Sequence, residues 1–156
     1  LMKKKTFLVT GGTGFIGSHI SELLVNKNFK VKIYDNNSLG RSINIKNFKN
    51  KIIFIKGDIR NKKLLKKALK GVDAVIHLAY VNGTKHFYNI PIEILDIAVK
   101  GITNILECCM TKQCEECFIW IIHRLLIVPL QSKDEIMYGH YLNHDIYRSG
   151  LSGVSL

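Results

Sequence analysis

The sequence predicts an α/β fold, an open parallel sheet of about five strands with helices on both faces. Short apolar runs alternate with longer runs of helical period over the first 120 or so residues, a pattern typical of parallel strands joined by right-handed helical crossovers. The run at 51–56 is almost continuously apolar, as in strands buried on both faces. With 156 residues and 47% apolar side chains, the chain has the size and composition of one globular domain.

The first strand, Thr6–Thr10, runs directly into a glycine-rich turn that precedes a helix expected over Phe15–Asn26. In this turn Gly11, Gly14 and Gly17 stand three residues apart. One glycine permits the turn, one lets the backbone approach a pyrophosphate, and one lets the helix pack closely on the strand. The N–H groups and the dipole at the start of the helix then face the phosphates. Such glycines also occur in ordinary loops, so the prediction of a dinucleotide site depends on the elements that follow.

The second strand, Lys30–Asp35, alternates apolar and polar residues and stops at an acid 18 residues after Gly17. In this fold a carboxylate at about that position accepts hydrogen bonds from the adenosine ribose hydroxyls. It also repels a 2′-phosphate, so we expect NAD to be preferred over NADP. The alternative is that Asp35 only ends the strand or initiates a turn.

The remaining elements continue the alternation of strands and helices. Residues 36–41 are expected to form a loop, and Ser42–Lys51 is polar and poorly periodic. The elements expected after it are a strand at 51–56, a helix at 61–70, a strand at 74–79, a loop at 80–89, a long helix from Pro91 and a fifth strand at 117–122.

Charge and hydropathy exclude several classes of protein. The formal net charge of +11 suits a polyanion, but the lysines are spread along the chain, and those at 61–70 alternate with apolar residues as on the solvated face of a helix. Nucleic-acid binding is therefore not expected as the main function. Gly11 interrupts the first apolar stretch too early for a secretory signal, and the run at 118–130 contains His123 and Arg124 and is too short to cross a bilayer. A cytoplasmic protein without a membrane segment is expected.

Four cysteines lie within ten residues: Cys108, Cys109, Cys114 and Cys117. The last two form a C-x-x-C pair with His123 nearby, which is one pattern for zinc. Cys108 and Cys109 instead continue an apolar helix stripe, where cysteine acts as a small buried hydrophobe. Buried thiols without a metal are the favoured interpretation.

Together these residues resemble a known family, the extended short-chain dehydrogenase/reductases, and within it the NAD-dependent epimerase/dehydratases that act on nucleotide sugars. The resemblance covers residues 3 to about 118 and implies the Rossmann, NAD(P)-binding fold. It rests on five stretches in register: Thr10-Gly11-x-x-Gly14-x-x-Gly17, Asp35-Asn36-Asn37 with Gly40-Arg41, Gly57-Asp58-Ile59-Arg60, His77-Leu78-Ala79, and Gly101 to Glu107.

The resemblance implies a role in NAD binding for eleven residues. Gly11, Gly14 and Gly17 would surround the pyrophosphate, Phe15 and Ile16 would donate backbone N–H groups, Asp35 would hold the ribose with Asn36 and Asn37 beside it, Asp58 and Ile59 would flank adenine, and Ala79 would border the cofactor. A nucleotide sugar is the substrate that the resemblance implies. His77 is interpreted as a packed core histidine.

The sequence departs from the family most strongly in its catalytic residues. Family chemistry needs a Ser or Thr at the end of strand five and a Tyr with Lys four residues later, whose ammonium lowers the pKa of the phenol for proton transfer. No tyrosine here has Lys at that spacing, and a Ser-rich segment is replaced by the apolar residues around Trp120. We therefore assign no catalytic residue. Two milder departures are Tyr80, where a small residue is usual, and Ala98, where many members have Asn.

We accordingly expect an NAD-binding portion at 1–122 and a tail at 123–156 without family similarity or a sheet strand. Such a tail resembles the product of a truncated gene or a shifted reading frame, and the chain is expected to be inactive alone. The fifth strand would then be an exposed apolar edge open to self-association. The alternative is a non-catalytic dinucleotide-binding or sensing module. A metal or acid/base cluster in the tail is a weaker alternative, with members His140, His144, Asp145 and Tyr147.

Overall fold

The structure, a computed structural model, describes residues 4–81, 84–113, 116–121 and 124–129. Side chains are described for residues 4–81, 86 and 88–111. The predicted tail cluster at 140–147 and the side chains of Cys114, Cys117 and His123 lie outside these ranges. The division of the chain at residue 122 therefore stays a prediction.

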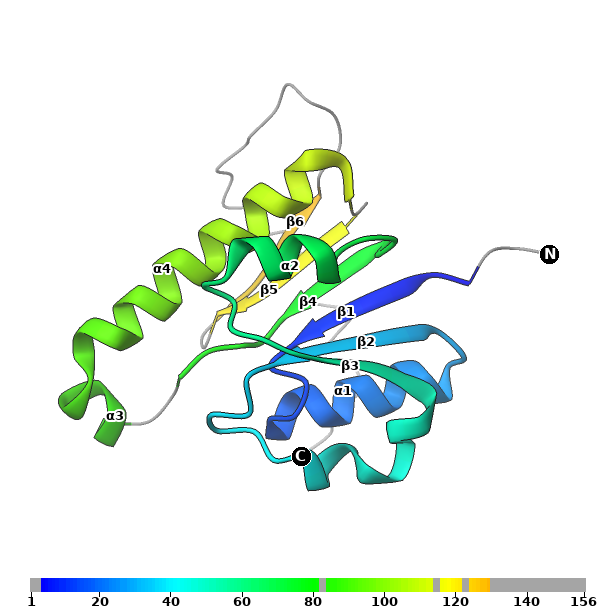
Figure 1. Cartoon of the computed structure of the whole chain (residues 1–156), viewed down its shortest axis with the longest axis horizontal. Coiled ribbons are helices and arrows are strands. Elements are labelled where there is room, and N and C mark those ends of the chain that lie inside the picture. The colour runs from blue at the N-terminus through cyan, green and yellow to red at the C-terminus, as the bar shows by residue number, and fades with distance from the viewer. Residues whose placement is uncertain (1–3, 82–83, 114–115, 122–123, 130–156) are drawn as a thin grey trace, which may run out of the picture.

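A six-stranded sheet runs through the described part of the chain in the order β3-β2-β1-β4-β5-β6 (Figure 1). Its strands are β1 (Thr6–Thr10), β2 (Lys30–Asp35), β3 (Ile52–Lys56), β4 (Ala74–His77), β5 (Glu116–Ile121) and β6 (Arg124–Pro129). The first five strands are parallel to one another, whereas β6 runs antiparallel to β5. The predicted open parallel sheet is confirmed, with one added strand.

Helices cover both faces of this sheet (Figure 1). On one face lie α1 (Phe15–Asn26) and the 3₁₀ helix η1 (Ser42–Lys51), and on the other lie α2 (Lys62–Ala68) and α4 (Pro91–Cys108). Successive strand residues point to opposite faces, so Leu8 packs into the α2/α4 core and Val9 into the α1/η1 core, both fully buried. Each such burial contributes about 1.5–3 kcal/mol.

The helix boundaries follow local chemistry. Asn61 caps α2, its side chain accepting the Leu64 N–H at 3.1 Å, and Gly71 follows the helix with φ +71°. Pro91 stands in the first turn of α4, where its missing N–H costs nothing. In η1, which the sequence did not predict, Ile45 and Phe48 are buried at the spacing of three residues that one 3₁₀ turn brings onto one side.

Two expectations for the later part of the chain are wrong. The expected loop at 80–89 contains a short helix, α3 (Thr84–Asn89), which leads into α4, and a π-helical turn, η2 (Cys109–Gln113), follows α4. The expectation of no strand after residue 122 fails at β6, because Arg124–Pro129 forms a strand whose four middle residues, Leu-Leu-Ile-Val, are apolar.

Strand β6 also overturns the expected exposed edge. Six residue pairs, from Glu116↔Pro129 to Ile121↔Arg124, join β5 and β6, and only two residues separate the strands in the sequence. The backbone of β5 is therefore paired on both sides, by β4 and by β6. Strand β5 is thus not an edge strand, and self-association of the chain stays a prediction.

Candidate functional site

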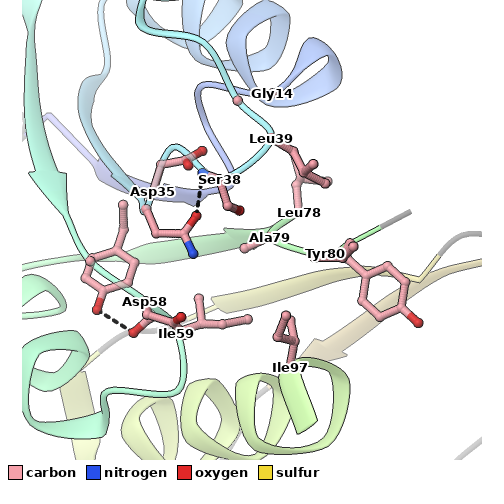
Figure 2. A pocket seen from close by; sticks show the side chains of 16 residues that line it. Gly14, Asp35, Ser38, Leu39, Asp58, Ile59, Leu78, Ala79, Tyr80 and Ile97 are labelled. Carbon is pink, nitrogen blue, oxygen red and sulfur yellow. Dashed lines mark hydrogen bonds between the residues drawn. The ribbon is translucent and has the colours of Figure 1, made fainter. Parts of the chain in front are cut away.

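A pocket opens at the carboxyl ends of the first four strands (Figure 2). It lies where the strand order reverses between β1 and β4, the position at which open α/β sheets bind ligands. The residues that line it lie at or just after the ends of four strands, with one from α4: Gly11, Gly14, Tyr34, Asp35, Asn36, Ser38, Leu39, Gly40, Gly57, Asp58, Ile59, Leu78, Ala79, Tyr80, Val81 and Ile97.

The three glycines of the turn meet different surroundings. Gly11 has φ +70°, its N–H donates to the Tyr34 carbonyl at 3.0 Å, and a Cβ here would lie 2.7 Å from the Ala79 nitrogen. A Cβ on Gly17 would overlap the Gly11 carbonyl oxygen. At Gly14 a Cβ would meet only that same oxygen, at 3.2 Å, and would otherwise enter the pocket. Glycine is thus required at positions 11 and 17 by close packing, and at position 14 to keep the pocket open.

The start of α1 presents unpaired backbone donors beside the pocket. Gly14 is the N-cap, and the first helical bond joins the Ser18 N–H to its carbonyl at 3.0 Å. The N–H groups of Phe15, Ile16 and Gly17 therefore have no acceptor within the helix. The Phe15 side chain is 79% exposed, and the first turn carries no acidic residue. This end of α1 suits an anion.

Asp35, at the end of β2, is buried and joins two loops. Its Oδ2 accepts the Thr13 N–H at 3.0 Å, and its Oδ1 accepts the Asn37 N–H at 2.7 Å. The Thr13 hydroxyl donates to the Asn37 side chain at 3.0 Å, and Asn37 adopts φ +59°. Asn36 faces the pocket and accepts the Ser38 N–H at 2.9 Å. Asp35 thus reaches the pocket and also fixes the glycine turn to the loop after β2.

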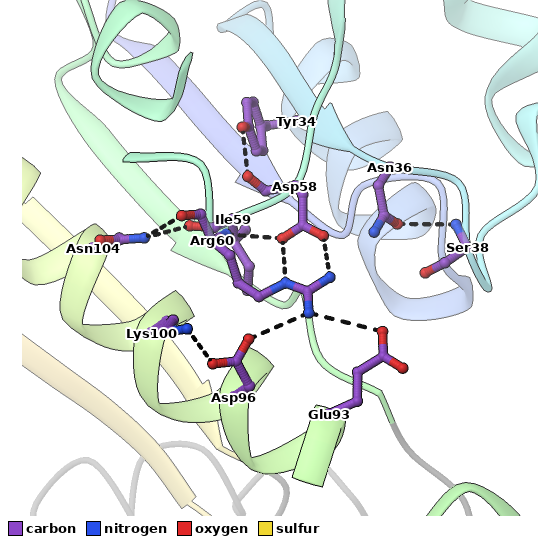
Figure 3. A network of polar contacts seen from close by, with 10 residues as sticks. All are labelled: Tyr34, Asn36, Ser38, Asp58, Ile59, Arg60, Glu93, Asp96, Lys100 and Asn104. Atoms are coloured by element: carbon purple, nitrogen blue, oxygen red, sulfur yellow. Dashed lines mark hydrogen bonds and ion pairs between the residues drawn. The ribbon is translucent and has the colours of Figure 1, made fainter. Parts of the chain in front are cut away.

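An ion-pair network stands behind the opposite wall of the pocket and includes Asp58 of that wall (Figure 3). Asp58 follows β3, and both its carboxylate oxygens accept from the Arg60 guanidinium, Oδ1 from Nε at 3.0 Å and Oδ2 from Nη2 at 2.6 Å. These bonds hold the pKa of the Asp58 carboxyl below its usual range. The Tyr34 hydroxyl donates to the Asp58 carbonyl at 2.8 Å, and burial, with the Asp58 charge second, raises the pKa of Tyr34 to about 12.

A buried pair joins β1 to β4 beneath the pocket. The Thr10 hydroxyl lies 2.6 Å from the Nδ1 of His77, and its oxygen accepts the backbone N–H groups of Leu78 and Ala79 at 3.2 and 3.3 Å. A hydroxyl whose oxygen accepts these N–H groups can donate its own proton to Nδ1, an arrangement that fits a neutral ring with its proton on Nε2. Burial lowers the pKa of His77 to about 4, in agreement with its interpretation as a core histidine.

The structure brings seven of the eleven predicted residues to the pocket wall: Gly11, Gly14, Asp35, Asn36, Asp58, Ile59 and Ala79. The other four, Phe15, Ile16, Gly17 and Asn37, lie next to it in the glycine turn and in the loop after β2. Tyr80 also lines the pocket, and its ring points away from Asp35 and Gly14 (Figure 2).

Sequence reasoning missed the side chains that hold these residues in place. Arg60 and Asn104 stand inside two of the stretches that carry the family resemblance, and that position was a signal for them. Their contacts could not be predicted from the sequence. Nothing in the sequence marked Tyr34 or Thr13 as part of the site, except that Tyr34 precedes Asp35 and Thr13 lies in the glycine turn.

Within the described ranges, no group of three or more His, Cys, Asp or Glu residues is arranged to hold a metal ion. Cys108 and Cys109 are buried, as the helix stripe predicts. No helix among the described residues combines the length and the apolar character needed to cross a membrane.

Comparisons with known proteins agree with this geometry. Residues 8–125 match the model of the GDP-mannose 4,6 dehydratase family. A protein of Methanocaldococcus jannaschii with the provisional name UDP-glucose 4-epimerase is 44% identical over 101 residues, 64% of this chain and 32% of that protein. The chain thus spans about a third of this relative's length.

Solved structures give the same result. An epimerase of Methanothermobacter thermautotrophicus superposes with a TM-score of 0.70 at 32% identity, over 75% of this chain and 35% of that one. A UDP-glucose 4-epimerase of Thermus thermophilus in complex with NAD has a TM-score of 0.62, also at 32% identity, over 68% and 34%. The chain therefore belongs to the nucleotide-sugar epimerase/dehydratase family of the extended short-chain dehydrogenase/reductases, and it corresponds to the amino-terminal part of the family fold.

Proposed function

We propose that the crevice at the ends of β1 to β4 binds NAD, and that the chain is the NAD-binding part of a nucleotide-sugar epimerase or dehydratase. The observation that carries the proposal is the turn at Gly14. Of the three motif glycines, this is the one where a side chain would fill the pocket rather than clash with folded backbone on several sides. Relatives bearing NAD support the same cofactor.

In this proposal each predicted residue has a defined part. Gly14 leaves room for the pyrophosphate, Gly11 and Gly17 let the turn pack around it, and the pyrophosphate accepts the N–H groups of Phe15 and Ile16. Asp35 accepts from the adenosine ribose, and Asn36 and Asn37 shape the loop around it. Asp58 and Ile59 border adenine, and Ala79 borders the cofactor beside β4. The pyrophosphate is thus assigned to Gly11, Gly14, Phe15, Ile16 and Gly17, and the ribose to Asp35, Asn36 and Asn37. The adenine is assigned to Asp58 and Ile59, and the side of the cofactor next to β4 to Ala79.

We further propose that NAD is preferred over NADP. Both Asp35 oxygens already accept backbone N–H groups, which holds the carboxylate in place at the end of β2. A 2′-phosphate would be brought next to this buried charge. No positive side chain stands within five residues after Asp35 in the sequence, the first being Arg41.

Bound NAD supplies a hydride acceptor, the relatives named above are epimerases, and the matching family model is that of the GDP-mannose 4,6 dehydratases. Within these 156 residues no Tyr is followed four residues later by Lys, and no Ser or Thr stands at the end of β5. We therefore propose binding without turnover by this polypeptide alone. The same observation favours the second candidate, a dinucleotide-binding or sensing module that carries out no chemistry.

Calorimetric titration of the purified chain with NAD and with NADP tests the binding proposal. We expect one NAD site per chain and at least about tenfold weaker binding of NADP. An assay with UDP-glucose, UDP-galactose and dTDP-glucose in the presence of NAD tests turnover, for which we expect none. A folded chain that binds neither dinucleotide overturns the proposed function, and turnover without an added partner overturns the second part.

A further inference from the structure

We propose that helix α4 is a positioning element for the adenine side of the pocket, acting through Arg60, and that Asp96 sets how strongly the site distinguishes adenine from other purines. The inference rests on the proposed NAD site and adds to it residues that line no part of the pocket. It starts from the network in Figure 3, in which side chains of α4 reach the loop after β3.

The first step concerns the donors around Asp58. Arg60 supplies three of them: its backbone N–H to Oδ1 at 2.8 Å, Nε to Oδ1 at 3.0 Å, and Nη2 to Oδ2 at 2.6 Å. A carboxylate has about four lone-pair positions, so one on Oδ2 is left. Asn36, which also lines the pocket, stabilises the charged form of Asp58 from its side chain, so the donor of a ligand would replace Asn36 at the remaining position. Arg60 therefore fixes which part of the carboxylate remains for a ligand.

The second step concerns what holds Arg60. Its remaining nitrogen, Nη1, lies 3.4 Å from Oδ2 of Asp96 and 3.8 Å from Glu93, both on α4. Asp96 is held in turn by Lys100, one turn later, at 2.6 Å. The guanidinium thus bridges the loop carboxylate and the helix carboxylates, and its plane is set from both sides.

The third step concerns the backbone of the same loop. The Asn104 side chain donates to the carbonyls of Ile59 and Arg60 at 2.9 and 3.1 Å. Gly101, three residues earlier on α4, leaves the space that the Ile59 side chain fills. Asp96, Lys100 and Asn104 follow one another at four-residue spacing, so one face of α4 holds the loop.

The consequence is a readout of the base. The exocyclic amino group of adenine is a hydrogen-bond donor, and the lone pair left on Asp58 is an acceptor at the pocket wall. Hypoxanthine carries a carbonyl oxygen at that position and would face the carboxylate unpaired. Since hydrogen bonds to charged groups are strong, we expect the chain to bind NAD at least about tenfold more tightly than nicotinamide hypoxanthine dinucleotide.

The test compares the full chain with Asp96→Asn, and uses Glu107→Gln as the matched control. Glu107 is on the same helix and also pairs with a basic side chain, Lys62 of α2, but it lies outside the network. The measurements are the dissociation constants of the two dinucleotides, the melting temperature, and amide hydrogen exchange at residues 57–61 without ligand. A merely structural role would weaken both dinucleotides equally, whereas a positioning role changes their ratio.

We expect Asp96→Asn to lower the preference for NAD at least about threefold and to speed exchange of the Arg60 amide, with Glu107→Gln like wild type. An unchanged ratio, or equal loss for both dinucleotides, overturns the inference, as does a wild type that binds the two equally. If the wild type binds neither dinucleotide, the proposed function fails, and the hydrogen-exchange data alone then test the positioning role of α4. Unchanged exchange at 57–61 in Asp96→Asn then overturns the positioning role.

Discussion

The two ends of the pocket are built from different material. At the end proposed for the phosphates, between β1 and α1, the pocket is built from backbone atoms: three glycines and the N–H groups that open the helix. At the end proposed for the adenosine, between β2, β3 and α4, it depends on charged side chains, with Arg60 joining Asp58 to Asp96. Substitutions at the first end should therefore act through steric clashes of the new side chain. Substitutions at the second end should act by breaking ion pairs and hydrogen bonds.

The largest effect is expected at the phosphate end, from Gly17→Ala. Gly to Ala inside a helix normally stabilises by up to about 1 kcal/mol, but here the new methyl group would overlap the Gly11 carbonyl. We expect a loss of more than about 2 kcal/mol in the free energy of unfolding, measured by urea denaturation. Gly14→Ala is the matched control, with a loss below about 1 kcal/mol. Equal losses would contradict the different surroundings assigned to the two glycines.

Gly14→Val should separate binding from folding. Its branched side chain would occupy the pocket while meeting little of the protein, so we expect a near-native circular dichroism spectrum and NAD binding weakened more than about a hundredfold. Tight NAD binding by the folded variant would mean that the glycine loop is only a turn.

At the ribose, Asp35→Asn removes the charge and keeps an acceptor for one backbone N–H. The preference for NAD over NADP should fall from at least about tenfold toward unity. Asp35→Ala should in addition lower stability by about 1–3 kcal/mol, because the N–H groups of Thr13 and Asn37 lose their acceptor. A preference unchanged in Asp35→Asn would place the origin of selectivity elsewhere.

The smallest effect concerns Arg60→Met and depends on pH. Because Arg60 depresses the pKa of Asp58 in the folded chain, the pair stabilises the fold above the ordinary carboxyl pKa of about 4, and this stability is lost as pH falls through the folded value. We expect the free energy of unfolding of wild type to exceed that of the variant by about 1 kcal/mol at pH 7, a small difference because the pair is partly exposed. Thermal unfolding at pH 7 and at pH 3 should show the gap closing. A gap that widens in acid would refute the assignment.

The same contrast explains what could be predicted from sequence. Glycines, the acid after β2 and the strand periodicity report backbone requirements, so β1, α1 and β2 were predicted with the bounds that the structure shows. The Asn104 side chain acts across 44 and 45 positions of the chain and the Arg60 side chain reaches Asp96 across 36, and no local pattern encodes such pairs. Strand β6 was missed because the expected continuation was a family segment, whereas Arg124–Pro129 pairs locally with β5.

The most direct measurement of the central claim is a map of amide chemical shifts on the ¹⁵N-labelled chain during titration with NAD. Binding in the crevice predicts the largest changes at Gly11, Phe15, Ile16, Asp58, Ile59 and Ala79, with little change at the opposite edge of the sheet around Lys30 and Ile53. Shifts centred on that opposite edge, or a folded chain whose spectrum NAD leaves unchanged, would contradict the account.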